Sequence, residues 1–317
     1  MKKIGGFFEL EIADGESLFH DNSIKLSTAR ACLNLILQTK RYSKVYLPFY
    51  CCNASIEPLD LCGISYEFYN IDEQLEICNN IVLKPTEAII YCNFFGIKAA
   101  YVNHLVEVYK EQVIIDNSHA FFIKGYKNNF SFTTARKYFG VPDGAFLYAP
   151  NKIITTNFYR NNRVSLNHNL NRLLGKQKQA YQEFVSYEKN LDSNINIISI
   201  VSEKILKTIN YSKVRAIRDE NFSFFKKEFQ ELNQISINDE TDCFCYPLLL
   251  NKPIDKELLF NKNIFIPSYW LDVTKRKMVE GFQFENKLSL ELLPLPIDHR
   301  YTKEDLIRVS IAIKKMI

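Results

Sequence analysis

One lysine of this sequence is predicted to lie on a tight turn between two strands, where an amine could be held in place for chemistry. Lys137 follows a strand-like run, residues 129–133, and precedes a turn containing Gly140, Pro142 and Gly144. Glycine and proline at this density hold the backbone in turn geometry, so we expect Lys137 to lie on a shaped turn between two strands. For this segment alone, the more ordinary interpretation is a surface hairpin with an inert lysine.

A carboxylate follows a different apolar run. Asp116 comes directly after residues 113–115, and such a position lies at the carboxyl edge of a sheet, where open α/β proteins bind ligands. One interpretation is a turn cap, since Asp, Asn and Ser all form caps. The other is a carboxylate that binds a protonated ring nitrogen. At about 4 Å and an effective dielectric of about 20, that pair is worth about 4 kcal/mol before desolvation.

A third feature is the start of an apolar, helix-like stretch at residues 24–38. Ser27 and Thr28 are good N-cap residues, and a helix N-terminus attracts phosphate through its backbone N–H groups. Most helices begin in this way, so the signal is weak alone. In chain order, however, the three features are what a pyridoxal phosphate enzyme needs: a phosphate anchor, a partner for the pyridine nitrogen and an amine for the aldehyde.

The composition excludes several other classes of protein. The 317 residues carry a net charge of 40 − 36 = +4 without a long basic tract, so binding to nucleic acid is not expected. The eight cysteines include no C-x-x-C pair or zinc spacing, and we predict no metal site. No G-x-G-x-x-G, Walker A, H-E-x-x-H or G-x-S-x-G motif occurs. No signal peptide or membrane-length apolar run is visible, so we predict a soluble, cytoplasmic protein without membrane insertion.

The elements that must position these residues alternate between strands and helices in the first half. We expect strands at 45–49, 65–71, 88–95, 113–116, 129–133 and 145–148, and helices at 29–38, 53–62 and 101–110. In the second half we expect two or three helices within 167–190 and 195–231, strands at 243–250 and 263–267, and a closing helix at 302–316 capped by Thr302. The first pattern predicts an α/β domain, residues 1–165, and the second a smaller α+β domain, residues 166–317.

Six stretches of the chain, in order, carry a family resemblance. They are Leu26-Ser-Thr-Ala-Arg-Ala-Cys-Leu, Leu47-Pro-Phe-Tyr-Cys-Cys, Tyr91-Cys-Asn-Phe-Phe-Gly, Ile115-Asp-Asn-Ser-His-Ala, Arg136-Lys-Tyr-Phe-Gly-Val-Pro-Asp-Gly and Leu293-Pro-Leu-Pro-Ile-Asp-His-Arg-Tyr. These resemble motifs of the DegT/DnrJ/StrS-type sugar aminotransferases, which are fold type I pyridoxal phosphate enzymes. The fifth stretch is similar to a motif of a capsule and O-antigen subgroup, and the sixth resembles a C-terminal motif of the family. The resemblance implies a large domain with a mixed, mostly parallel sheet between helices.

The resemblance also implies roles for individual residues. Lys137 would bind the cofactor aldehyde, and Asp116 would face the pyridine nitrogen. The other implied cofactor contacts are His119 beside the ring, Cys52 at the position of a stacking aromatic, and Thr28, Ala29, Arg30 and Thr134 at the phosphate. Arg136, Trp270 and Arg300 are weaker candidates for contact with the substrate. Four positions depart from the family pattern: Ala29 and Ala145 replace glycines, Cys52 replaces the aromatic, and Thr134 replaces a serine whose hydroxyl it retains.

The function that follows is a pyridoxal phosphate-dependent aminotransferase. It would transfer an amino group, with glutamate as the expected donor, to a keto-sugar or nucleotide-sugar in surface polysaccharide biosynthesis, and it would act as a homodimer. Because of the departures, the alternative is a protein with this fold that binds ligands in the same pathway without turnover. A related dehydratase is less consistent with Lys137, because that subgroup typically has histidine there. A plain nucleotide-binding module lacks its glycine signature.

Overall fold

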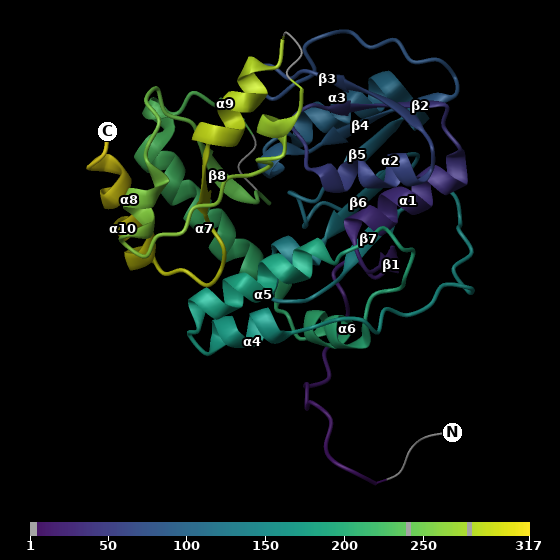
Figure 1. The fold of residues 1–317 in the computed structure, drawn as a ribbon, viewed down its shortest axis with the longest axis horizontal. Helices are drawn as coiled ribbons and strands as arrows, with labels where there is room; N and C mark the ends of the chain where they lie inside the picture. Colours follow the sequence, from purple (N-terminus) through teal and green to yellow (C-terminus); the bar gives the residue numbers. More distant parts are fainter. Residues whose placement is uncertain (1–4, 239–241, 278–280) are drawn as a thin grey trace.

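The computed structural model describes residues 5–238, 242–277 and 281–317, and its largest feature is a seven-stranded sheet (Figure 1). The strands are β1 (Ile24–Leu26), β2 (Lys44–Pro48), β3 (Ser65–Tyr69), β4 (Glu87–Cys92), β5 (Val113–Asp116), β6 (Phe130–Thr134) and β7 (Ala145–Tyr148). Their order is β1-β7-β6-β5-β4-β2-β3. Strand β7 is antiparallel to both of its neighbours, and the other pairs are parallel. This confirms the predicted mixed, mostly parallel sheet.

Both faces of the sheet are buried. The helices of the first half are α1 (Ala29–Lys40), α2 (Glu57–Leu61) and α3 (Ala99–Tyr109). Ile90 and Ile114 belong to a core with α1 and α2, whereas their neighbours Ile89 and Ile115 belong to a second core with α3 and C-terminal elements. Successive strand residues point to opposite faces, so apolar residues at consecutive positions of a strand are expected for a sheet covered on both sides.

Helix α1 begins where the sequence predicts. Thr28 has extended backbone geometry, and its Oγ1 accepts the N–H of Ala31 over 3.0 Å. The apolar side chains of α1 pack on the sheet and fix the axis of the helix. The first turn of α1 thereby lies beside the carboxyl ends of the strands, because Thr28 and the strand-end residues Cys92 and Asp116 line one cavity.

The second half contains more helices than predicted. They are α4 (Asn167–Leu173), α5 (Gln177–Lys189), α6 (Ile200–Lys207), α7 (Tyr211–Phe229), α8 (Lys256–Phe260), α9 (Gln283–Glu291) and α10 (Lys303–Lys314). Residues 167–231 form four of these helices rather than two or three. The extra break between α4 and α5 occurs at Gly175, which has a φ of +75°. Thr302 caps α10 in a capping box with Asp305, as expected.

A small second sheet pairs β8 (Cys245–Leu248) with β9 (Leu293–Pro296) in antiparallel register. The predicted strand at 263–267 is wrong: Ile264 and Ile266 are buried and Phe265 is exposed, but the segment pairs with no strand among the residues that the structure describes. Short 3₁₀ turns complete the fold: η1 (Asn53–Ser55), η2 (Phe94–Gly96), η3 (Lys110–Gln112), η4 (Ala135–Lys137), η5 (Gln230–Leu232) and η6 (Val273–Lys275).

The two halves of the chain are in direct contact. One continuous apolar core joins strands β4 and β5 to α7, β8, β9 and α10. Figure 1 shows α7, β8 and α10 gathered at one side of the large sheet. A domain boundary at residue 165 stays a prediction. In the described part of the chain, no helix has the length and apolar character needed to cross a membrane.

Candidate active site

Lys137 lies at the end of η4, directly after β6, where the sequence predicts a shaped turn. Thr134 caps this turn, because its Oγ1 accepts the N–H of Arg136 over 3.4 Å. Gly144 ends the segment that follows Lys137. Its φ is +123°, and a Cβ at this position would lie only 2.9 Å from the side chain of Ile198, so both the backbone conformation and the available space favour glycine. Its N–H donates to the carbonyl oxygen of Ser27 over 2.7 Å, which joins the lysine turn to the start of α1.

A buried carboxylate fastens the same turn to α6. Asp143 is 0% exposed and accepts hydrogen bonds from the N–H and Oγ of Ser199, over 2.8 and 2.6 Å, and from Nδ2 of Asn161 over 3.0 Å. The hydroxyl of Ser202 donates to it as well. Ser199 is the N-cap of α6, so the carboxylate also lies at the positive end of a helix. This network fixes the segment that follows Lys137.

Asp116 ends β5, in register with Cys92 of β4 and Phe132 of β6. Ser118 donates its backbone N–H to Asp116 Oδ1 over 2.8 Å. Burial raises the pKa of the Asp116 carboxyl above its usual value, while the positive charge of Lys137 and the hydrogen bonds from Ser118 act in the opposite direction. The Asp116 carboxylate is therefore desolvated, and a second cation beside it, in addition to Lys137, would stabilise its charged form.

Asp116 and Lys137 line one cavity of about 150 Å³ at the carboxyl edge of the sheet. A cavity of about this volume holds a benzene-sized ring. Its lining includes the strand ends Pro48, Cys92, Asp116 and Thr134, the helix start Thr28, Ala29 and Arg30, and Cys51, Cys52, Ser118, Phe132, Arg136, Lys137, Glu188, Leu191 and Trp270. Among the described residues, no group of three or more His, Cys, Asp or Glu is arranged to hold a metal ion.

The start of α1 forms one end of this cavity. Thr28, Ala29, Arg30 and Thr134 all line it, and the hydroxyl-bearing Thr28 and Thr134 are 6% and 5% exposed. The first backbone N–H groups of a helix have no intrahelical partner and lie at the positive end of the helix dipole. This end of the cavity is therefore suited to an anion such as phosphate.

A closing segment, residues 188–193, covers the start of α1. Thr28 Oγ1 donates to the carbonyl oxygen of Asp192 over 3.2 Å, and Arg30 Nη1 donates to that of Leu191 over 2.8 Å. The hydroxyl of Thr134 likewise donates to a backbone carbonyl. A phosphate bound here would compete with the present acceptors of these three donors, and two of those acceptors, Leu191 and Asp192, belong to the closing segment.

Arg136 is paired across the cavity with Glu188 of α5. Its Nε donates to the carbonyl oxygen of Pro142 over 2.8 Å, and its guanidinium lies 5.9 Å from the ring centroid of Tyr187. Arg136 is also the immediate chain neighbour of Lys137. The structure shows that Glu188 offsets the charge of Arg136 and holds the guanidinium at the cavity wall.

His119 lies behind the cavity rather than among the described residues that line it. Its ring is 1% exposed and stacks with Phe244 at 4.6 Å and with Trp270 at 5.3 Å between centroids. Phe95 donates its backbone N–H to His119 Nδ1 over 3.2 Å, so this nitrogen accepts. Burial, and then the charge of Lys137, lower the pKa of His119 well below its usual value and keep the ring neutral.

Of the remaining predicted site residues, two line the cavity and one lies at the surface. Cys52 is half-buried and lines the cavity just before η1. Trp270 reaches the same cavity from the C-terminal half. Arg300 is exposed, bonds to Asp298 through Nε at 2.6 Å and Nη2 at 3.0 Å, and lies outside the lining.

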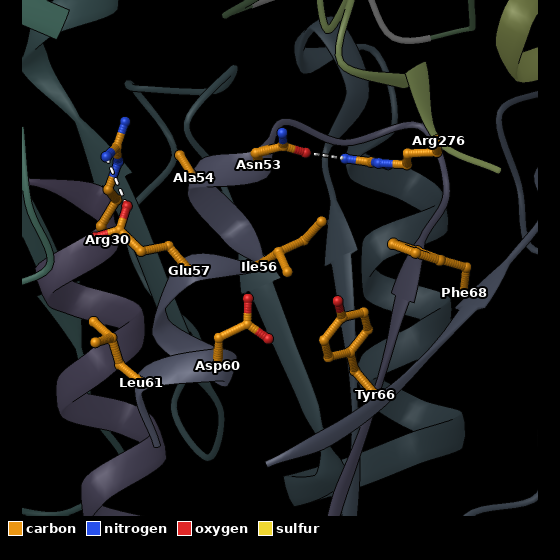
Figure 2. Close-up of a pocket in the computed structure, with 10 residues that line it drawn as sticks. All are labelled: Arg30, Asn53, Ala54, Ile56, Glu57, Asp60, Leu61, Tyr66, Phe68 and Arg276. Carbon is orange, nitrogen blue, oxygen red and sulfur yellow. Dashed lines mark hydrogen bonds and ion pairs between the residues drawn. The ribbon is translucent and has the colours of Figure 1, made fainter. Parts of the chain in front are cut away.

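A second, wider cleft of about 590 Å³ opens beside the first. Arg30 and Ala54 line both spaces, so the cleft continues the cavity toward the surface. Figure 2 shows Arg30 bonded to Glu57 on one side, at 2.7 Å, and Arg276 bonded to Asn53 on the other, at 3.0 Å. Tyr66, Phe68, Ile56, Asp60 and Leu61 complete its lining. The cleft thus offers aromatic faces, two carboxylates, two guanidinium groups and an amide in a space of ligand size.

Sequence reasoning missed several residues of the cavity. Ser118 had a usable signal, because the residue two places after an aspartate commonly donates its N–H to that carboxylate. Glu188 and Leu191 had none, because they follow Lys137 by about fifty residues and reach the cavity only through the packing of α5. Asp143 was part of a recognised motif, but its partners on α6 were not predictable.

Comparison with known proteins finds solved structures of similar fold but no match to the sequence. No protein-family model and no curated protein matches the sequence. The solved structure of the sugar aminotransferase CalS13 from Micromonospora echinospora superposes with a TM-score of 0.60 at 13% identity, covering 94% of this chain and 88% of that one. A DegT DnrJ EryC1 StrS aminotransferase from Brucella abortus gives 0.58 at 13% identity, with 92% and 85% covered. NtdA from Bacillus subtilis, with bound cofactor PMP, gives 0.65 at 13% identity, with 92% and 72% covered.

The chain has the fold of the sugar aminotransferases. The likeness extends over nearly the whole length of this chain. It confirms the predicted fold type I architecture, which was inferred from six short motifs. At this level of identity the likeness concerns the fold, so the chemistry has to be argued from the residues of the cavity.

Proposed function

We propose that this protein is a pyridoxal phosphate-dependent aminotransferase. The observation that carries the proposal is that Asp116 and Lys137 line one ring-sized cavity whose end is formed by the start of α1. The donor set fits the cofactor: an amine for its aldehyde, a carboxylate for its ring nitrogen and helix N–H groups for its phosphate. The raised pKa of Asp116 supports the fit, because a buried carboxylate gains from a cationic partner.

Each residue has a proposed task in this chemistry. Lys137 would bind the cofactor aldehyde through Nζ and, once released, carry a proton to and from the reacting carbon. Asp116 would keep the ring nitrogen protonated. Thr28, Ala29, Arg30 and Thr134 would bind the phosphate, and Cys52 would lie toward the ring. His119, which does not line the cavity, would support the cavity wall from behind. When bound, the cofactor supplies an electron sink for a carbanion.

The substrates follow from the resemblance and the surroundings of the cavity. We propose a keto-sugar, free or nucleotide-linked, as acceptor and glutamate as amino donor, in the biosynthesis of a capsule or O-antigen polysaccharide. Arg136 and Trp270 line the cavity and are proposed substrate contacts; Arg300 is a third candidate. The wider cleft of Figure 2 adjoins the cavity and has room for the part of the acceptor that does not react.

A homodimer in the cytoplasm is the proposed working form. Large apolar side chains of the α4–α5 hairpin are exposed, namely Leu170, Leu173, Tyr181 and Phe184. Exposed apolar side chains gathered on one hairpin support an interface with a second copy. Light scattering of the purified protein tests the dimer: a mass of one chain at micromolar concentration contradicts it.

The alternative function is ligand binding without turnover. The observation that favours it is that the hydroxyls of Thr28 and Thr134 already donate to backbone carbonyls, while Ala29 and Cys52 replace family residues. One experiment separates the two functions. Purified protein with added cofactor should show a yellow absorbance that Lys137→Ala abolishes, and it should convert glutamate to 2-oxoglutarate when a keto-sugar is supplied. Yellow protein without amino transfer to any keto-sugar supports the alternative.

A further inference from the structure

A cofactor ring bound in the cavity would need side chains to pack against its two flat faces. Cys52 offers only a small thiol. Among the described residues, Trp270 is the one member of the lining that comes from beyond residue 191. Apart from Phe132, which lies in the sheet, it is also the only aromatic ring that the described part of the chain contributes to the lining. The indole of Trp270 is therefore the one large flat surface that the C-terminal half brings to the cavity.

Trp270 is held there against a conformational cost. Its φ is +54°, in the left-handed region that bulky residues rarely occupy. Its carbonyl oxygen accepts the N–H of Val273 over 2.9 Å and the Oγ of Ser289 over 3.3 Å. Non-glycine residues in this region cost about 1–3 kcal/mol, persist where their surroundings determine them, and cluster at ligand sites.

The indole is also supported from behind. It is parallel to the ring of His119, with an angle of 2° and 5.3 Å between centroids, and it meets Tyr50 edge-on at 4.5 Å. His119 in turn stacks with Phe244 at 4.6 Å, and Lys137 Nζ lies 5.9 Å from the centroid of Phe244. Trp270, His119 and Phe244 form an aromatic column that connects the cavity wall to the surroundings of the lysine. This role gives a reason for burying a neutral His119.

We propose that Trp270 contacts the cofactor ring and replaces the stacking aromatic that Cys52 does not supply. This inference rests on the proposed function and assigns the ring contact to a residue outside the family motif. Stacked aromatic rings attract each other beyond the burial of their surface. A rigid indole at the wall would position the cofactor before the substrate arrives, and the substrate bound to that ring would meet the same residue.

The test compares the affinity for pyridoxal 5′-phosphate in the full-length protein and its variants. Trp270→Ala should raise the dissociation constant about tenfold, whereas Trp270→Phe, which keeps a ring, should raise it by no more than about threefold. Phe265→Ala is the matched control, because Phe265 is an exposed aromatic outside the cavity, and it should leave the affinity unchanged. A Trp270→Ala protein that binds the cofactor as tightly as the unaltered chain overturns the inference.

A second measurement needs no variant, because Trp270 is the only tryptophan of the chain. Acrylamide should quench its fluorescence at least about twofold less efficiently after the cofactor is bound, because the ring then covers the indole. Equal quenching with and without cofactor, in protein that has turned yellow, contradicts the contact and leaves the proposed function intact. If the unaltered protein does not turn yellow with added cofactor, the proposed function itself fails.

Discussion

Asp116 ends strand β5 and Lys137 lies in the turn after strand β6, twenty-one positions later, yet the two residues line the same small cavity. Burial raises the pKa of Asp116, and the positive charge of Lys137 opposes part of that rise. Asp116 is held by the parallel register of β5 with β4 and β6, and Lys137 by the turn that leaves β6. The parallel order of these strands is what places their carboxyl ends, and hence both residues, at one edge of the sheet.

The first prediction concerns the charge of Asp116 in the cofactor-free protein. Its pKa is raised by burial, so its contribution to stability is present below about pH 3.9, the value in the unfolded chain, and is lost as the pH rises through the folded pKa. At neutral pH the carboxylate therefore destabilises the fold. Asp116→Asn should raise the melting temperature at pH 7 and not at pH 3, whereas Asp60→Asn, at an exposed carboxylate, should do neither.

The same substitution should have the opposite effect on turnover. Asp116→Asn removes the anion that would keep the ring nitrogen protonated, a pair worth about 4 kcal/mol before desolvation. We expect amino transfer to slow by at least about a hundredfold, while the cofactor still binds. Stopped-flow absorbance of the half-reaction with glutamate measures this. An unchanged rate would remove Asp116 from the proposed chemistry.

A separate prediction concerns the pair formed by Arg136 and Glu188. If Arg136 binds a carboxylate of the amino donor, Arg136→Ala should raise the KM for glutamate about tenfold or more with a smaller change in kcat. Glu188→Gln frees the guanidinium and should lower that KM. The pair of Arg160 and Glu203, with 2.8 Å between charged atoms, lies outside the cavity lining, so Glu203→Gln is the control. If Glu188→Gln and Glu203→Gln have the same KM for glutamate, Arg136 does not bind the amino donor.

The buried network around Asp143 should be important for stability. Asp143→Ala leaves the donors of Ser199, Ser202 and Asn161 without their acceptor, so we expect a loss of about 3 kcal/mol in the free energy of unfolding. Asp143→Asn keeps one carbonyl oxygen and should lose less. Urea unfolding followed by circular dichroism compares the two. If both variants are as stable as the unaltered protein, the network does not hold the lysine turn.

The cap of α1 provides a prediction about the phosphate end. Thr28→Ala removes the side-chain acceptor for Ala31 and should cost about 1 kcal/mol of stability and weaken binding of the cofactor. Thr28→Ser keeps the hydroxyl and should preserve both. Inorganic phosphate serves as a second probe, because it should protect the unaltered protein and Thr28→Ser from thermal unfolding more than it protects Thr28→Ala. Equal protection of all three proteins would place the anion elsewhere.

Much of the fold was predictable because its strands are short, apolar and bounded by glycine, proline or asparagine. The runs at 113–116 and 145–148 coincide with β5 and β7. The strand predicted at 263–267 fails for an instructive reason: its alternating burial is strand-like, but β8 pairs with β9 instead. The hydrophobic pattern of a segment indicates which of its side chains are buried, but it does not indicate whether another strand lies alongside to form the hydrogen bonds.

The site residues that lie at the ends of strands or at the start of a helix could be predicted from the sequence. Those that reach the cavity from distant parts of the chain could not. Asp116, Lys137 and Thr28 each have a local signal in the sequence. Glu188 and the closing segment have none, because their positions depend on where the chain that leaves α5 meets the start of α1. Cys52 and Trp270 illustrate the same limit: the first is visible as a departure from a motif, whereas the second reaches the cavity only in three dimensions.

The most direct test of the account is to fix the cofactor to the protein by reduction. Full-length protein is incubated with pyridoxal 5′-phosphate, treated with sodium borohydride, digested and analysed by mass spectrometry. The account predicts one stoichiometric label, on Lys137, that is absent from Lys137→Ala and unaffected in a Lys256→Ala control. A label spread over several surface lysines, or none on Lys137, would contradict it.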